Sequence, residues 1–138
     1  MSSESSNVEA VWAASSPVSG RFSPSEVTST AAELLERYRQ LRERGEGYVE
    51  VRLPNRGFPV VTVGFRGGLA VAHVADGPTS MALLRGDGSV SPDQLVEVPI
   101  MDDAAQFSGD IAMTLDSAWG LLDDFLRTGL VRGHQVLL

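Results

Sequence analysis

Four short apolar segments follow one another between Tyr48 and Leu84, separated only by turn residues. The first of them alternates apolar and polar side chains, which is typical of a half-buried strand. Gly67-Gly68 stands between the second and third segments, and a Gly-Gly pair tolerates the positive φ angles of tight hairpin turns. This pattern predicts an antiparallel meander with strands over Tyr48–Leu53, Phe58–Phe65, Leu69–Ala75 and Thr79–Leu84.

The segment before the meander has the signature of an amphipathic helix over Thr30–Arg44. Thr30 and Glu33 form a capping box, in which each side chain satisfies an exposed backbone N–H group. Leu34, Tyr38 and Leu41 follow at helical spacing. Gly45 is the expected stop, because glycine adopts the left-handed cap conformation without a Cβ penalty.

A second helix is predicted over Asp110–Arg127. Thr114 or Asp116 is its expected N-cap, and Gly129 is its expected stop. Because each helix has only one apolar stripe, both helices are expected to cover the same face of the sheet. The stripe of the second helix contains Leu115, Ala118, Trp119, Leu122, Phe125 and Leu126.

The remaining segments give weaker signals. Short strands are predicted over Val8–Ala13, Glu26–Thr28, Gln94–Val98 and His134–Leu138, and irregular structure over Ser15–Ser25, Arg85–Pro92 and Pro99–Asp110. The sequence therefore predicts a disordered tail over residues 1–7 and a single α+β domain over residues 8–138. That domain has a mostly antiparallel sheet of about five to seven strands, with two amphipathic helices packed on one face.

The charge of the chain narrows the class of partner. The 138 residues have a formal net charge of −7, and residues 86–126 contain Asp and Glu but no Arg or Lys. Nucleic-acid binding and binding to anionic membranes are disfavoured, because both need a basic surface. A basic protein is the natural electrostatic complement of such a chain.

The N-terminal sequence has no basic region followed by an apolar one, as a secretory signal would. Apolar runs are a few residues long, far short of the roughly 20 that span a bilayer. We therefore expect a cytoplasmic protein that does not enter a membrane.

The sequence offers little that indicates catalysis. There is no Cys, and the two histidines, His73 and His134, have no neighbouring metal-ligand pattern. His73 is interpreted as a structural residue on a strand face. The adjacent pair Asp102-Asp103 is expected to point its carboxylates apart, whereas acid–base catalysis needs both to face one substrate. We therefore predict a protein that is not an enzyme, without catalytic residues, metal ligands or cofactors.

The order of these elements resembles the Imm1 family of immunity proteins from bacterial polymorphic toxin systems. Val8–Trp12 is similar to the opening strand of that family, and Val27–Leu35 to the entry into its first helix. The meander lies where the family has its strands. Leu115–Gly129 is similar to the closing helix, which ends here in Phe125-Leu-Arg-Thr-Gly129.

The resemblance implies a protein that binds a cognate toxin domain and blocks its active site or its access to substrate. Nuclease and deaminase toxins have basic clefts, into which acidic groups can be steered. We therefore hypothesise that the toxin-contacting residues are Glu97, Asp102, Asp103 and Asp110. Two alternatives remain open, a small acidic secretion chaperone or adaptor and a structural subunit; the oligomeric state is also open.

Overall fold

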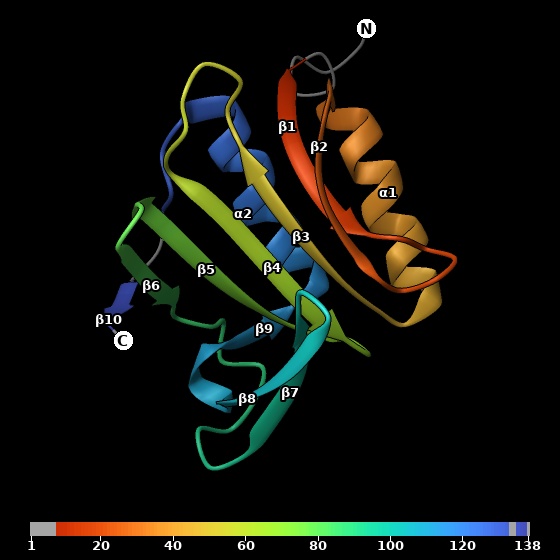
Figure 1. Cartoon of the computed structure of the whole chain (residues 1–138). Coiled ribbons are helices and arrows are strands. Elements are labelled where there is room, and N and C mark those ends of the chain that lie inside the picture. Colours follow the sequence, from red (N-terminus) through yellow and green to blue (C-terminus); the bar gives the residue numbers. More distant parts are fainter. Residues whose placement is uncertain (1–7, 133–134, 138) are drawn as a thin grey trace, which may run out of the picture.

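A long antiparallel sheet organises the chain (Figure 1). In this computed structural model, which describes residues 8–132 and 135–137, the strand order is β10-β6-β5-β4-β3-β1-β2. β9 joins the same sheet beside β5, and β7 and β8 form a separate hairpin. The strands are β1 (Glu9–Ser15), β2 (Phe22–Thr30), β3 (Glu46–Arg52), β4 (Val60–Arg66), β5 (Leu69–Gly77), β6 (Ser80–Leu84), β7 (Leu95–Ile100), β8 (Asp103–Ser108), β9 (Ala112–Thr114) and β10 (Gln135–Leu137), and the helices are α1 (Ala31–Arg44) and α2 (Leu115–Thr128).

Both helices pack on one face of the sheet, which we call the helix face. Alternate residues of the strands, such as Val49, Val61 and Ala72, point toward the helices and are fully buried. Leu34 and Tyr38 of α1 join them in one apolar core, together with the stripe of α2 that the sequence predicts. The predicted α+β fold, with a mostly antiparallel sheet and two helices on one face, is therefore confirmed.

The ends of both helices follow the predicted capping chemistry. In α1 the Glu33 N–H donates to Thr30 Oγ1 at 3.2 Å and the Thr30 N–H donates to Glu33 Oε1 at 3.3 Å. Gly45 ends the helix at a φ of 100°. In α2 the N-cap is Thr114, whose Oγ1 accepts a hydrogen bond from the Ser117 N–H at 3.1 Å.

The start predicted for the second helix was wrong. Residues 109–111 form a short 3₁₀ helix and residues 112–114 form β9, so α2 begins only at Leu115. Ala112 lies opposite Val71 of β5, and both side chains are fully buried. Pairing with the sheet therefore outweighs the helical pattern at these residues.

The other face of the sheet is partly covered by the β7–β8 hairpin, and we call it the hairpin face. Val96 and Val98 of β7 pack there against Val71 and Leu83 in a second, smaller core. The irregular segment predicted over Pro99–Asp110 was wrong, because residues 103–108 pair with β7 along their whole length.

β2 forms one edge of the sheet and has β1 as its neighbour. The loop predicted over Ser15–Ser25 was therefore wrong in part, since the strand begins at Phe22. Pro24 is accommodated because the register between β1 and β2 shifts at this point, and prolines in sheets occur at edges and irregularities. Of the strand predicted over His134–Leu138, residues 135–137 pair with β6; the tail predicted over residues 1–7 lies outside the described residues.

Candidate functional site

Three polar side chains lie in a row across the hairpin face, where Thr62 is buried and Glu50 and His73 are partly buried. Glu50 on β3 pairs with Thr62 on β4, and Thr62 pairs with His73 on β5. Their neighbours along each strand point to the helix face, so strand alternation brings these three side chains to the opposite side. We call Glu50, Thr62 and His73 the polar row.

The polar row lines a pocket beside the tip of the β7–β8 hairpin, with a cavity volume of about 260 Å³. Most of the remaining wall is apolar. Met81 and Met101, which both line the pocket, are 50% and 49% exposed, so the apolar wall reaches the molecular surface. The complete lining is Tyr48, Glu50, Val60, Thr62, His73, Ala75, Met81, Ile100 and Met101.

The carboxylate of Glu50 is the charged group of this pocket. The Tyr48 hydroxyl donates a hydrogen bond to Glu50 Oε2 at 2.8 Å. Burial raises the pKa of Tyr48, and the nearby Glu50 carboxylate raises it further. Within the described residues Glu50 forms no ion pair, because Arg52, two residues further along the same strand, binds Glu26 through two hydrogen bonds of 2.8 Å.

His73 lies at the other end of the polar row. Burial lowers its pKa, which favours the neutral imidazole. The ring of Phe107, from β8, packs edge-on against it with 5.6 Å between the ring centroids. His73 is therefore held between the sheet and the hairpin, consistent with the structural role expected on a strand face.

The polar row does not form a catalytic pair. Glu50 and His73 are separated by β4, and two strand spacings amount to roughly 10 Å. Acid–base partners need to be within hydrogen-bond reach of one another or of a common substrate atom. Across residues 8–132 and 135–137 no cluster of three or more His, Asp or Glu side chains is arranged to hold a metal ion. The arrangement supplies hydrogen-bond acceptors on an apolar wall, which is suited to binding.

The four acidic residues predicted to contact a partner lie along the β7–β8 hairpin and just after it. Asp102 and Asp103 are at the tip, where Ile100 pairs with Asp103. Asp110 follows the opposite end of the hairpin, and Glu97 lies between the two ends. A hairpin of six paired residues is roughly 20 Å long, so these carboxylates form no single patch.

Most of these acidic side chains are already engaged within the chain. Glu97 accepts a 2.5 Å hydrogen bond from Arg66, and Asp110 accepts one from the Ser108 hydroxyl. Asp102 Oδ1 accepts a hydrogen bond of 2.8 Å from the N–H of Phe22, the first residue of β2. The Asp103 side chain is exposed, and its carboxylate makes no hydrogen bond or ion pair with another described residue.

The tip of the hairpin has an unusual backbone. Met101 has a φ of 57°, in the left-handed region that side chains other than glycine seldom adopt. The apolar side chain of Met101 is half exposed, and Asp102 and Asp103 follow it in the turn. The fold therefore presents an apolar side chain and two carboxylates at one exposed turn.

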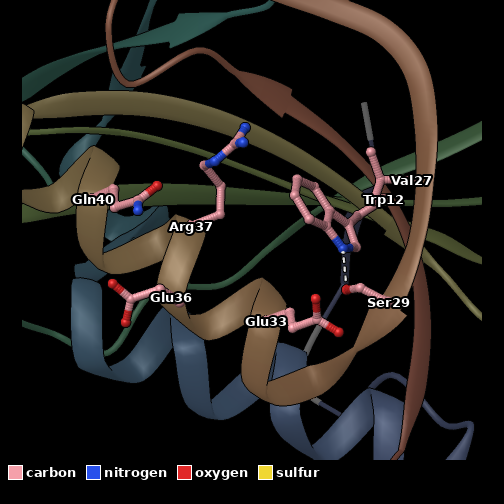
Figure 2. A pocket seen from close by; sticks show the side chains of 7 residues that line it. All are labelled: Trp12, Val27, Ser29, Glu33, Glu36, Arg37 and Gln40. Carbon is pink, nitrogen blue, oxygen red and sulfur yellow. Dashed lines mark hydrogen bonds between the residues drawn. The ribbon is translucent and has the colours of Figure 1, made fainter.

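A second hollow lies on the helix face, between β2 and α1 (Figure 2). Figure 2 shows Trp12 facing Arg37, and the guanidinium carbon of Arg37 lies 5.3 Å from the centroid of the indole ring. Trp12 Nε1 donates a hydrogen bond to Ser29 Oγ at 2.8 Å. The indole N–H therefore has its hydrogen-bond partner inside the chain.

The pocket on the hairpin face was not predicted from the sequence. The alternation in β3 indicated that Tyr48 and Glu50 share one face, but it did not reveal which side chains of β4, β5 and β6 lie beside them. Met81 and Met101 were not predicted as site residues because neither belongs to a sequence motif. A correct strand register would have revealed the polar row.

The chain is an α+β protein whose hairpin face carries a pocket with a polar row and an apolar wall. No helix in the described part of the chain is long and apolar enough to cross a membrane. In comparisons with known proteins, the chain matches no protein-family model and no curated protein sequence.

Proposed function

We propose that this chain is a non-enzymatic immunity protein that binds a cognate toxin domain and blocks it. The observation that carries the proposal is the exposed apolar surface formed by Met81 and Met101 around the pocket, with carboxylates at its rim. An apolar centre with a polar rim is typical of protein–protein interfaces. Methionine side chains adapt to irregular partner surfaces, which favours this use.

The charge of the rim favours a basic partner. Asp102 and Asp103 stand beside Met101, and the whole chain has a net charge of −7. Complementary charges steer association and exclude acidic competitors. The basic clefts of nucleic-acid-targeting toxins fit this requirement. Glu97 and Asp110 already have partners within the chain. We propose that they shape the hairpin and add to its negative electrostatic potential.

The proposal also draws on the resemblance of the sequence to Imm1 immunity proteins, whereas no protein-family model matches the chain. The resemblance implies a cytoplasmic protein, where an immunity protein would meet its toxin, and implies no cofactor. The α+β fold of the described chain agrees with the fold class expected from the sequence.

The test begins with a tagged chain captured from the cells that encode it, in about 50 mM and about 300 mM NaCl. The expected result is a protein with a C-terminal domain that is toxic when expressed alone and harmless when expressed with this chain. Its recovery should fall as salt rises. Toxicity that persists despite co-expression would overturn the proposal.

Charge reversal at the hairpin tip sharpens this test. Asp103→Lys is the preferred variant, because reversing Asp102 would also remove the hydrogen bond to the Phe22 N–H. Asp103→Lys is expected to weaken toxin binding about tenfold or more and to reduce its salt dependence. Glu36→Lys is the matched control, since Glu36 is an exposed residue of α1 on the other side of the sheet.

A secretion chaperone or adaptor is the second candidate, and the exposed edge of β2 favours it. β2 pairs with β1 on one side, and six consecutive residues within it are exposed. Exposed edges can take up an extended peptide as an additional strand. A captured partner that binds as an unfolded segment would favour this function, whereas a folded toxin domain favours immunity.

A further inference from the structure

The pocket on the hairpin face is lined by more hydrogen-bond acceptors than donors. The wall offers the Glu50 carboxylate, the Thr62 hydroxyl and the His73 imidazole, and its lining contains no Lys or Arg. A neutral imidazole keeps one nitrogen as an acceptor, and a carboxylate only accepts. The pocket therefore has more acceptors than donors and lacks positive charge.

Glu50 has unused capacity within this pocket. Its Oε2 accepts the hydrogen bond from Tyr48, and in the described part of the chain no other residue donates to this carboxylate. The nearest cation along the strand, Arg52, is held by Glu26. A partner that covered the pocket with apolar groups alone would bury this charge without compensation, which is costly.

The remaining wall is suited to a chain of methylene groups. Ile100, Met101 and Met81 line the pocket from the hairpin and from β6, and Val60 and Ala75 line it from the sheet. Long cationic side chains bury an apolar stem while their charged head contacts a polar group. An arginine or lysine side chain fits both parts of this pocket.

We infer that the pocket receives one arginine or lysine side chain of the protein partner, with its stem against Met81 and Met101 and its charged head at Glu50. This inference rests on the proposed protein-binding function and names the chemistry that the partner must supply. Asp102 and Asp103, at the adjacent hairpin tip, would attract the same basic segment before it docks.

The inference can be tested without the partner, with Nα-acetyl-arginine methylamide as the probe. Nuclear magnetic resonance would follow the backbone amides and methionine methyl groups of the isotope-labelled chain during titration. The expected result is saturable shifts around the polar row and at Met81 and Met101, with a Kd on the order of 1 mM. The citrulline analogue, which lacks the charge, is expected to bind about tenfold more weakly.

Glu50→Gln removes the charge but leaves an amide oxygen to accept from Tyr48, so the fold is expected to persist. This variant should weaken binding of the arginine probe about tenfold, whereas the matched variant Glu36→Gln should leave it unchanged. If Glu50→Gln fails to fold, Met81→Ala takes its place, because it removes stem contacts at a half-exposed position and should weaken binding about threefold.

Equal binding of the arginine and citrulline probes, or unchanged binding to Glu50→Gln, would overturn the inference. Capture of the partner then separates the two proposals. A toxin domain that binds Glu50→Gln as well as the unmodified chain would overturn the pocket assignment and leave the immunity function standing. Arginine binding at Glu50 without any toxin domain would support the cation pocket and count against immunity.

Discussion

Asp87, in the loop after β6, accepts three hydrogen bonds, one from its own loop and two from the start of α2. The Ser89 N–H donates at 3.0 Å, the Thr114 N–H at 2.9 Å and the Ser117 hydroxyl at 2.8 Å. Burial raises the pKa of Asp87, but these hydrogen bonds outweigh it and hold the pKa well below its usual value. One carboxylate thus joins the loop to the first turn of α2, where a negative charge is also favoured by the helix dipole.

Asp87→Asn is expected to lower the free energy of unfolding at pH 7 by about 1 kcal/mol, since the carboxylate is exposed enough for solvent to weaken its bonds. A lowered carboxyl pKa adds stability above the unfolded-state value of about 3.9, and this stability is lost as the pH falls through the folded pKa. The loss in the variant should therefore shrink below about pH 4. Urea unfolding from pH 7 to pH 3 measures the loss of unfolding free energy in Asp87→Asn, and Asp93→Asn is the control. A loss that does not change with pH would contradict the prediction.

His73 gives a second pH dependence. Burial lowers its pKa, so the unfolded chain binds a proton more readily than the folded chain. Stability from this group is present above about pH 6.5 and is lost as the pH falls toward the folded pKa, by at most about 1.4 kcal/mol per pH unit. His73→Asn should therefore flatten the decline in unfolding free energy between pH 7 and pH 5. Parallel declines in the two proteins would contradict this assignment.

At the scale of elements, the β7–β8 hairpin depends on a close approach between backbones. A Cβ atom at Gly64 of β4 would overlap the carbonyl oxygen of Pro99 at the end of β7. Glycine at this position therefore lets the hairpin lie directly on the sheet. The Phe22 N–H and Arg66 provide further anchors, through Asp102 and Glu97 respectively.

Gly64→Ala is expected to lower the free energy of unfolding by about 2 kcal/mol, the usual scale of overpacking in a well-packed site. The same change should weaken binding of the arginine probe, because it displaces Ile100 and Met101 from the pocket. Gly68→Ala is the matched control, since a Cβ atom there has open space. Chemical denaturation of both variants measures the effect, and equal stability of the two would contradict the role given to Gly64.

The elements that could be predicted from sequence are those with local signals. The capping box at Thr30 and the Gly67-Gly68 turn each lie within a few residues of what they specify, and both were confirmed. β8 was missed because Asp103, Ala104 and Ala105 lack strand-forming character and are ordered by pairing with β7. The polar row was missed for a related reason, since it depends on the register of three strands.

At the scale of the whole molecule, one sheet separates two cores of unequal size. The helix face holds the larger core, built from both helices and the inner residues of the strands. The hairpin face holds a smaller one around Val71, Leu83, Val96, Val98 and Ile111. Because the hairpin contributes its side chains to the smaller core alone, it is expected to open more easily than the central strands.

Hydrogen exchange under native conditions tests this difference. Amides of β4 and β5 are expected to exchange only through global unfolding, whereas amides of β7 and β8 should exchange faster through partial opening. Gly64→Ala should accelerate exchange in the hairpin more than in β4 and β5. Uniform exchange across all four strands would instead indicate a single cooperative unit.

The shared edge of β5 has a consequence for how this chain can diversify. β6 pairs with β5 from His73 onward and β9 pairs with it from Leu69 to Val71, so the chain leaves this edge after Leu84 and returns to it at Ala112. Residues 85–111 are an excursion between two strands that both keep their place on β5. Evolution or a protein engineer can therefore lengthen, shorten or rewrite this excursion to change the partner that is recognised, while the larger core continues to specify the fold.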